Sequence, residues 1–468
     1  MAPATLAVTM LSRALADPVL AEQVFSQPAL VERWGVLNAH LFDAGRELRE
    51  ALAAEPLSDE RRRAVDVFFA TRAARPDTAG AWAGAARGRN LILVQVESLQ
   101  EWVVHARVSG TPVMPFLDSA RSRGLYFPLV FDQTAHGRSS DAEFIALNSL
   151  PALERGAVAF RRPDNHFVTL ATVLREAGYE TISAHAFEAG FWNRGVLHPR
   201  YGFSRSLFAP DLGSGETIGW GLADGLFLGR MVPILEDLPR PFFAFLITLG
   251  LHHPFEAFPQ RHKVLDVGEL RDAPLGNYLH AMHYVDRALA TFVAELEKRG
   301  MLSDTVVAFY GDHEAGFGLD RRMLALAGNT TADQSALFRL RRVPFLVLAP
   351  GVSADADVAV VGGQVDIAPT LLHLLGVARP VSFLGGPLAP GRAVPAVLPG
   401  GSAASLDRLF VARGYGIPDS GLCFNFPGPG SRPLAECGAL KQAAAEELLA
   451  AHAVVEHDLA ATLAAPRR

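Results

Sequence analysis

Short, strongly apolar runs alternate with helix-like segments along the middle of the chain, and this alternation limits the fold more than any other feature. Runs with the length and composition of buried strands lie at 91–96, 181–184, 242–249, 305–310 and 344–348. Segments with apolar residues at helical spacing lie at 114–123, 141–148, 168–177, 275–299 and 365–375. This order predicts an α/β fold, in which helices cover both faces of a mostly parallel sheet.

The two ends of the chain differ from this central region. Apolar residues recur at near-helical spacing before residue 71, and a linker rich in Pro, Gly and Ala follows. After Pro395 the composition shifts to Gly, Pro and Ala, ahead of a last helix predicted at 439–465. We therefore predict a helical segment with linker at 1–88, an α/β domain at 89–395 and a small C-terminal subdomain at 396–468.

The composition of the 468 residues, 50% hydrophobic and 20% charged, is typical of a folded globular protein. A formal net charge of -6 offers no basic surface for nucleic acid, although a local cationic site could still bind an anion. No apolar run approaches the ~18–20 residues that cross a bilayer, and no basic residue precedes the first apolar stretch as in a signal peptide. The sequence alone thus predicts a soluble chain without an export signal.

The chain contains two cysteines, Cys423 and Cys437, which lie close together in a segment rich in Gly and Pro. A disulfide would indicate an oxidising compartment. Two free thiols would fit the same spacing, so the sequence leaves both alternatives open.

Polar side chains stand where two of the predicted strands end. Glu97 follows the run at 91–96, and Asp312 and His313 follow the run at 305–310. The carboxyl ends of parallel strands form the ligand-binding edge of an α/β sheet. Two carboxylates, an imidazole and the hydroxyl of Ser139 are an N/O ligand set for one divalent metal.

Ser139 lies just before a predicted helix. Ser140 and Glu143 fit a Ser-x-x-Glu capping box, which would open that helix. A helix N-terminus favours an anion such as an alkoxide or a phosphate oxygen. Because a serine hydroxyl is a weak nucleophile until a base or a metal lowers its pKa, the pattern predicts a metal-dependent enzyme with a serine nucleophile.

Beyond these residues, whole segments resemble the motifs of the lipoteichoic acid synthase family, which are phosphoglycerol transferases of the alkaline-phosphatase-like, sulfatase-type superfamily. The resemblance extends over 90–377 and is carried by 90–98, 137–144, 186–194, 247–255, 310–313, 343–351 and 363–372. It implies a three-layer αβα sandwich and a sulfatase-type catalytic domain at 89–395.

The resemblance also implies one bound divalent ion, with Glu97, Ser139, Asp312 and His313 as its ligands. Manganese is the implied metal, with zinc and magnesium as alternatives. Ser139 stands where most family members have the threonine nucleophile.

Substrate residues follow from the same resemblance. His185, Trp192, Arg194 and His252 match residues that hold the phosphate and glycerol, with Arg194 and His252 also taking part in catalysis and His252 as the general acid. Phe187 stands where many relatives have a polar residue.

The implied reaction is the transfer of phosphoglycerol from a phosphatidylglycerol-like headgroup through a phosphoserine intermediate. The acceptor would be an alcohol of a glycan or glycerophosphate, or water. Alternatives are a phosphoethanolamine transferase, a two-metal phosphatase or phosphodiesterase, and a catalytically silent relative that senses lipid. Sulfatases need Cys/Ser-x-Pro-x-Arg, whereas Ser139 is followed by Ser-Asp-Ala-Glu. The implied location is the periplasmic or extracellular face of the cytoplasmic membrane, with the membrane surface as a partner.

Overall fold

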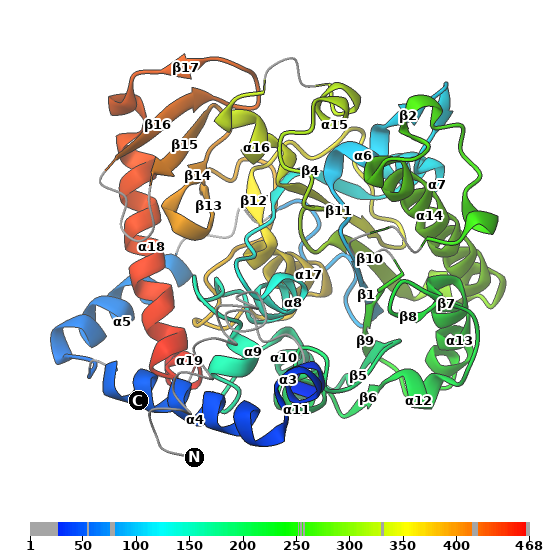
Figure 1. Ribbon diagram of the computed structural model, residues 1–468. Helices are drawn as coiled ribbons and strands as arrows, with labels where there is room; N and C mark the ends of the chain where they lie inside the picture. Colours follow the sequence, from blue (N-terminus) through cyan, green and yellow to red (C-terminus); the bar gives the residue numbers. More distant parts are fainter. Residues whose placement is uncertain are drawn as a thin grey trace.

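The computed structural model describes residues 27–53, 56–74, 80–250, 252, 255, 258–328, 332–413 and 420–464. Its centre is an eight-stranded sheet in the order β12-β4-β11-β10-β1-β9-β5-β6 (Figure 1). Strands β10, β1, β9, β5 and β6 are parallel, and β11 runs antiparallel to both of its neighbours. The strands are β1 (Asn90–Val96), β4 (Leu125–Phe131), β5 (Glu180–His185), β6 (Arg205–Leu207), β9 (Phe242–Ile247), β10 (Thr305–Gly311), β11 (Arg342–Leu348) and β12 (Gly362–Gly363).

Helices cover both faces of this sheet, which confirms the predicted fold class (Figure 1). Leu91 and Leu93 of β1 join the hydrophobic cluster under one layer of helices, and Ile92 and Val94 join the cluster on the opposite face. Because both faces are buried, the strand is apolar throughout rather than alternating. The first layer contains α8 (Arg138–Asn148), α10 (Leu170–Glu176) and α17 (Ile367–Leu375), and the second contains α7 (Pro115–Ala120), α13 (Asp224–Glu236) and α14 (Pro274–Lys298).

A smaller antiparallel sheet, in the order β13-β14-β15-β16-β17, follows the central region. Its residues run from β13 (Ala396–Val397) to β17 (Ser431–Arg432), and α18 (Gly438–Glu456) packs against it. A disulfide joins Cys423 to Cys437, which resolves the alternative that the sequence left open. The division at residue 395 stays a prediction, because the second half of α18 packs into the core of the large sheet.

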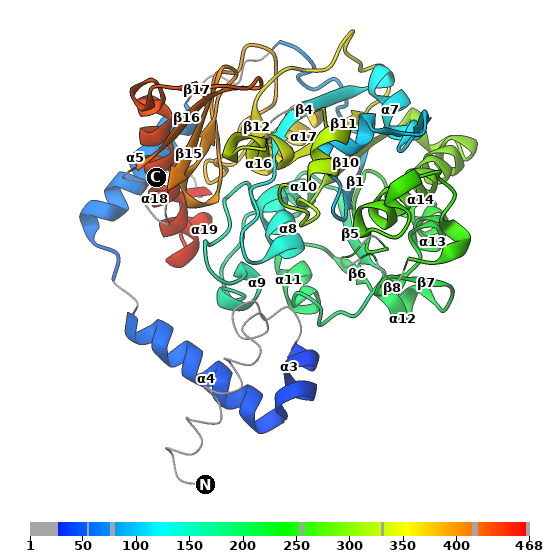
Figure 2. The same cartoon turned by 45° about the horizontal axis from the view of Figure 1, so that its top comes forward.

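The N-terminal segment contains α3 (Gln27–Trp34), α4 (Val36–Ala53) and α5 (Asp59–Ala73) in the described part of the chain. Helix α5 lies beside α18, and Arg72 forms a 2.8 Å ion pair with the buried Glu447 (Figure 1). Helices α3 and α4 stand apart from the body of the molecule (Figure 2). The first 26 residues of the predicted helical segment lie outside the described residues. Among the described helices, none combines the length and hydrophobicity needed to cross a membrane.

One predicted helix differs in detail, and one strand of the large sheet was not predicted. The single helix predicted at 439–465 is broken, since α18 ends at Glu456 and α19 (Ala460–Ala464) follows a turn with Asp458 at φ 53°. The sequence also gave no sign of β4, whose interior holds Pro128. The ladder between β11 and β4 shifts register between Val343 and Phe345, opposite this proline, where a missing N–H can be tolerated.

Candidate active site

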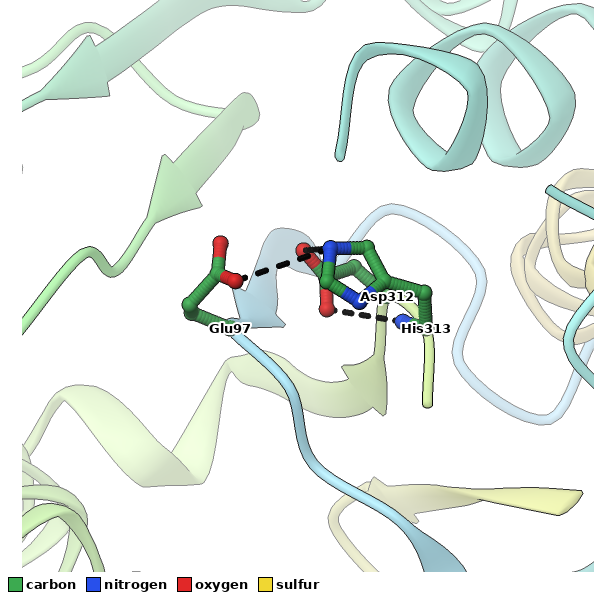
Figure 3. Close-up of side chains that lie close together, drawn as sticks. All are labelled: Glu97, Asp312 and His313. Carbon is green, nitrogen blue, oxygen red and sulfur yellow. Dashed lines mark hydrogen bonds and ion pairs between the residues drawn. The ribbon is translucent and has the colours of Figure 1, made fainter. Parts of the chain in front are cut away.

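Side chains from two neighbouring strands converge at the carboxyl edge of the sheet (Figure 3). Glu97 follows β1, and Asp312 and His313 follow β10, so the parallel pairing of these strands brings their ends together. One ligand atom from each residue lies within 4.8 Å of the others, and all three residues are buried. Ser139 completes the group, because its Oγ lies 3.1 Å from Glu97 Oε2 and 3.2 Å from His313 Nε2.

Asp312 is fixed by backbone donors on one side of its carboxylate. Its Oδ1 accepts hydrogen bonds of 2.7 Å from the backbone N–H groups of Ser98 and His313. Its Oδ2 is buried without a hydrogen-bond partner. Burial and the neighbouring Glu97 carboxylate raise the pKa of Asp312 well above its usual value. A cation between the two carboxylates would remove this repulsion and occupy the unpaired oxygen, so the residues present fit a divalent metal.

His313 presents one defined ring nitrogen to the same space. Its Nδ1 lies 2.9 Å from the Glu314 carbonyl oxygen, so Nδ1 carries the proton and donates to it. The lone pair of Nε2 therefore points at the group formed by Glu97, Ser139 and Asp312. An imidazole held in this tautomer by a carbonyl is the usual arrangement of a histidine that binds a metal.

Ser139 lies in the first turn of α8, but the predicted capping box is wrong. Helix α8 begins at Arg138, and Ser140 Oγ donates to the Gly137 carbonyl at 3.0 Å instead of accepting from the helix. The Glu143 side chain turns away from the helix end and binds Arg194. A local sequence pattern was outweighed here by a buried ion pair with a residue from another helix.

Arg194 is buried and opens α11 (Arg194–Arg200). Its Nε lies 2.9 Å from Glu143 Oε1, and its Nη2 bonds the same oxygen. Its Nη1 is buried without a hydrogen-bond partner, so one donor of the guanidinium is available to an anion. Trp192 and Asn193, with φ of 54° and 56°, form the left-handed turn that places Arg194.

Two more of the predicted substrate residues lie on this turn and on β5. Trp192 is buried, with its ring 6.2 Å from that of Phe160. His185 ends β5 and faces the Ile247 carbonyl oxygen with Nδ1 at 3.3 Å, while its Nε2 is buried without a partner. Burial, reinforced by the charge of Arg194, holds the pKa of His185 well below its usual value, so the ring is neutral.

His252 lies in the loop after β9, at the edge of a small hollow. The hollow is lined by Gly219, Trp220, Gly250, His252, Phe255, Phe258 and Ala281. The rings of His252 and Trp220 stack with centroids 3.8 Å apart. Sequence reasoning missed Trp220, because it lies in a hairpin that carries no recognisable motif.

The comparisons with known proteins agree with this geometry. The sulfatase family profile matches residues 89–377, more than half of the chain. The chain belongs to the sulfatase family. Among curated proteins, the lipoteichoic acid synthase-like YvgJ of Bacillus subtilis is 31% identical over 84% of this chain and 64% of its own length. The lipoteichoic acid synthase of Staphylococcus aureus is 29% identical over 80% of this chain and 59% of its own.

Solved structures of the sulfatase-type fold give the same result. The lipoteichoic acid synthase LtaP of Listeria monocytogenes has a TM-score of 0.76 and 25% identity, covering 83% of this chain and 97% of that one. The Streptococcus pyogenes phosphoglycerol transferase GacH, solved with sn-glycerol-1-phosphate, has a TM-score of 0.52 and 18% identity over 70% of this chain and 85% of its own, and shows the fold alone. The resemblance to lipoteichoic acid synthases is thus confirmed. The chain spans 56–64% of the length of the first curated relatives it matches.

Proposed function

We propose that this protein is a metal-dependent phosphoglycerol transferase or phosphodiesterase that uses Ser139 as its nucleophile. The observation that carries the proposal is the convergence of Ser139 Oγ with Glu97, Asp312 and His313 in one buried group, in which Asp312 Oδ2 has no hydrogen-bond partner and lies 3.5 Å from His313 Nε2. The similarity to lipoteichoic acid synthases supports the assignment.

One divalent ion would be held by Glu97, Ser139, Asp312 and His313. Bound there, it would lower the pKa of the Ser139 hydroxyl and neutralise charge on a phosphoryl oxygen. Manganese is proposed, with zinc or magnesium as alternatives. In the described part of the chain, Glu97, Asp312 and His313 form the one group of three or more such side chains placed to hold a metal, which favours one ion over a two-metal phosphatase.

The remaining steps belong to residues of the chain. Ser139 loses its hydroxyl proton to solvent, and its Oγ attacks phosphorus, forming a glycerophosphoserine as the bond from phosphorus to the leaving alcohol breaks. Arg194 Nη1 donates to a phosphoryl oxygen and stabilises the charge that develops there. His252 gives a proton to the leaving oxygen, and His185 and Trp192 hold the glycerol. An acceptor alcohol of a glycan or glycerophosphate, or water, then releases the group from Ser139.

The substrate and location are part of the same proposal. The donor would be an anionic phospholipid headgroup, with phosphatidylglycerol as the first choice and phosphatidylethanolamine as the alternative. The disulfide between Cys423 and Cys437 supports an oxidising compartment, such as the outer face of a cytoplasmic membrane. The polar sequence after Ser139 does not supply the Pro and Arg that a sulfatase needs, so sulfate ester hydrolysis is not proposed.

The test is manganese-dependent turnover of a soluble glycerophosphate diester by wild type, Ser139→Ala and Ser140→Ala. We expect Ser139→Ala to lose turnover by at least about 10³-fold, since it lacks the nucleophile. Ser140→Ala is the matched control, because its hydroxyl bonds the Gly137 carbonyl and does not touch the metal group. Mass spectrometry of the quenched wild type should show a glycerophosphate adduct on Ser139.

Adding glycerol to the assay distinguishes a transferase from a phosphodiesterase. Transfer to glycerol in preference to water would identify a transferase, and hydrolysis in both cases would identify a phosphodiesterase. An adduct that forms on Ser140, or turnover by Ser139→Ala at the wild-type rate, would contradict the proposal. Binding of manganese without any turnover of glycerophosphate or ethanolamine phosphate diesters would support the silent, lipid-sensing alternative instead.

A further inference from the structure

Trp220 stands at the tip of a tight hairpin beside the candidate active site. The hairpin consists of β7 (Thr217–Ile218) and β8 (Gly221–Leu222), with Gly219 at φ 63° and Trp220 between the two strands. Trp220 is 39% exposed. Its ring lies beside the rings of Phe187, Phe191 and His252, at the edge of the hydrophobic cluster that contains Phe191.

The hairpin lies between the loop after β5 and the loop after β9, which carry candidate substrate residues. The Leu222 N–H donates to the Ala186 carbonyl at 3.1 Å, one residue beyond His185. On the other side, a Cβ added to Gly219 would lie 3.4 Å from the Gly250 carbonyl oxygen, two residues before His252. The hairpin backbone therefore touches the loops after both β5 and β9.

A polar contact ties the base of the hairpin to the same loop that follows β9. Glu216, directly before β7, accepts from His262 Nε2 at 2.7 Å and also pairs with Arg261. These contacts lie on the partly exposed side of the loop, so each is weak by itself. Together with the backbone contacts they tie the hairpin to the chain segment that follows β9.

The Trp220 ring covers one face of the His252 imidazole. The centroids are 3.8 Å apart and the planes differ by 28°, which is a stacked arrangement. The ring of Phe191 lies 5.6 Å from Trp220 and 6.4 Å from His252. Since an imidazole forms hydrogen bonds in the plane of its ring, a stacked partner fixes the plane without blocking the nitrogens.

We propose that Trp220 is a positioning residue that fixes the ring plane of His252 for proton donation to the leaving alcohol. The inference rests on the proposed function. In the step concerned, the bond between phosphorus and the leaving oxygen breaks and its electron pair stays on that oxygen. The proton on the His252 ring nitrogen moves to that oxygen. In the same step phosphorus forms its new bond to Ser139 Oγ. Without Trp220 the imidazole loses the ring stacked on its face, and fewer encounters have the nitrogen aligned with the leaving oxygen.

Dependence on the leaving group tests this role. Turnover of two substrates is measured in the presence of manganese. One is the p-nitrophenyl ester of glycerophosphate, and the other is the n-butyl ester. Nitrophenolate leaves without a proton, whereas butoxide needs one. A general acid contributes about 10²–10⁴-fold, so His252→Gln should lose about that factor with the butyl ester and little with the nitrophenyl ester.

Trp220→Leu, which removes the ring and keeps an apolar side chain, should follow the same pattern. We expect kcat for the butyl ester to fall by about 10-fold or more and kcat for the nitrophenyl ester to change by less than about 3-fold. Trp220→Phe retains a stacking ring and should recover most of the butyl ester activity. KM for both esters should stay near the wild-type value.

Other results would overturn the inference. Equal losses on both esters, or a change confined to KM, would mean that Trp220 only supports the loop or binds substrate. Full activity of Trp220→Leu on the butyl ester would mean that the stack has no role. If wild type turns over neither ester in the presence of manganese, the proposed function fails, and the positioning role fails with it.

Discussion

At the scale of single residues, the site depends on atoms that the fold leaves unpaired. Asp312 Oδ2, His185 Nε2 and Arg194 Nη1 are all buried without a hydrogen-bond partner. A buried polar atom without a hydrogen-bond partner costs about 1–3 kcal/mol, and a bound ligand that pairs with it removes that cost. Asp312 Oδ2 and His185 Nε2 are acceptors, and Arg194 Nη1 is a cationic donor. A bound metal ion and a phosphoglycerol would supply partners for these atoms.

Glu143 shows how one side chain can be misread from sequence and what it does instead. We expect Glu143→Gln to destabilise the protein by about 3–5 kcal/mol, because it leaves the buried Arg194 charge without its partner. The matched control is Glu295→Gln, which breaks an exposed 3.5 Å pair with Lys298 and should cost less than about 1 kcal/mol. Urea unfolding of the three proteins measures the difference. Equal effects would refute a role for the pair.

The same pair has a pH signature. Burial opposes ionisation of Glu143, but the charge of Arg194 and the hydrogen bonds from His198 and Arg194 together lower its pKa below 4.5. A carboxylate with a lowered folded-state pKa contributes stability that is present above about pH 4.5 and is lost as the pH falls further. The difference in free energy of unfolding between wild type and Glu143→Gln should therefore be constant near neutral pH and become smaller in acid.

At the scale of elements, helix α7 is capped by another helix rather than by its own sequence. Met114 at its N-cap has no side chain that caps, and Asp286 of α14 accepts from the N–H groups of Phe116 and Leu117 at 2.8 and 2.9 Å. Burial raises the pKa of Asp286 from 3.8 to about 6. A raised carboxyl pKa gives stability that is present in acid and lost as the pH rises through the folded-state value.

This pH dependence of stability gives a prediction for Asp286→Asn. We compare the free energy of unfolding of wild type minus that of Asp286→Asn at two pH values. This difference should be about 1 kcal/mol larger at pH 5 than at pH 7, because wild type gains a proton on folding in that range. Urea unfolding at the two pH values checks the change, and the difference between the proteins removes the titration of other groups. A gap that stays the same at both pH values would show that Asp286 ionises as it does in the unfolded chain.

Sequence patterns predicted the elements whose signal is local and missed those that depend on distant partners. The strands that precede Glu97 and Asp312 are continuous apolar runs, and both were found. Strand β4 was missed because Pro128 interrupts its pattern, and the bulge that accepts it is visible only once β11 lies alongside. Trp220 could not be placed at the site, because its contact with His252 depends on the hairpin seating between two loops.

At the scale of the whole molecule, metal binding should be visible as added stability. Manganese at 100 times its dissociation constant should stabilise the protein by about 2.7 kcal/mol, which for a chain of this size raises Tm by about 3 °C. Thermal scans with manganese or with a chelator measure the shift. Asp312→Asn should abolish it, and Asp286→Asn should keep it. A full shift in Asp312→Asn would place the ion elsewhere.

Helix α18 has a consequence for how the protein can be divided. Leu440, Ala444 and Leu448 pack into the small C-terminal sheet, while Ala451 and Val454 pack into the core of the large one. The stretch shared with the sulfatase family ends at residue 377, before this helix begins. A fragment cut there would therefore expose apolar surface of its own core and aggregate. The segment that the family profile matches is therefore shorter than the unit that can fold, and the last helix belongs to that larger unit.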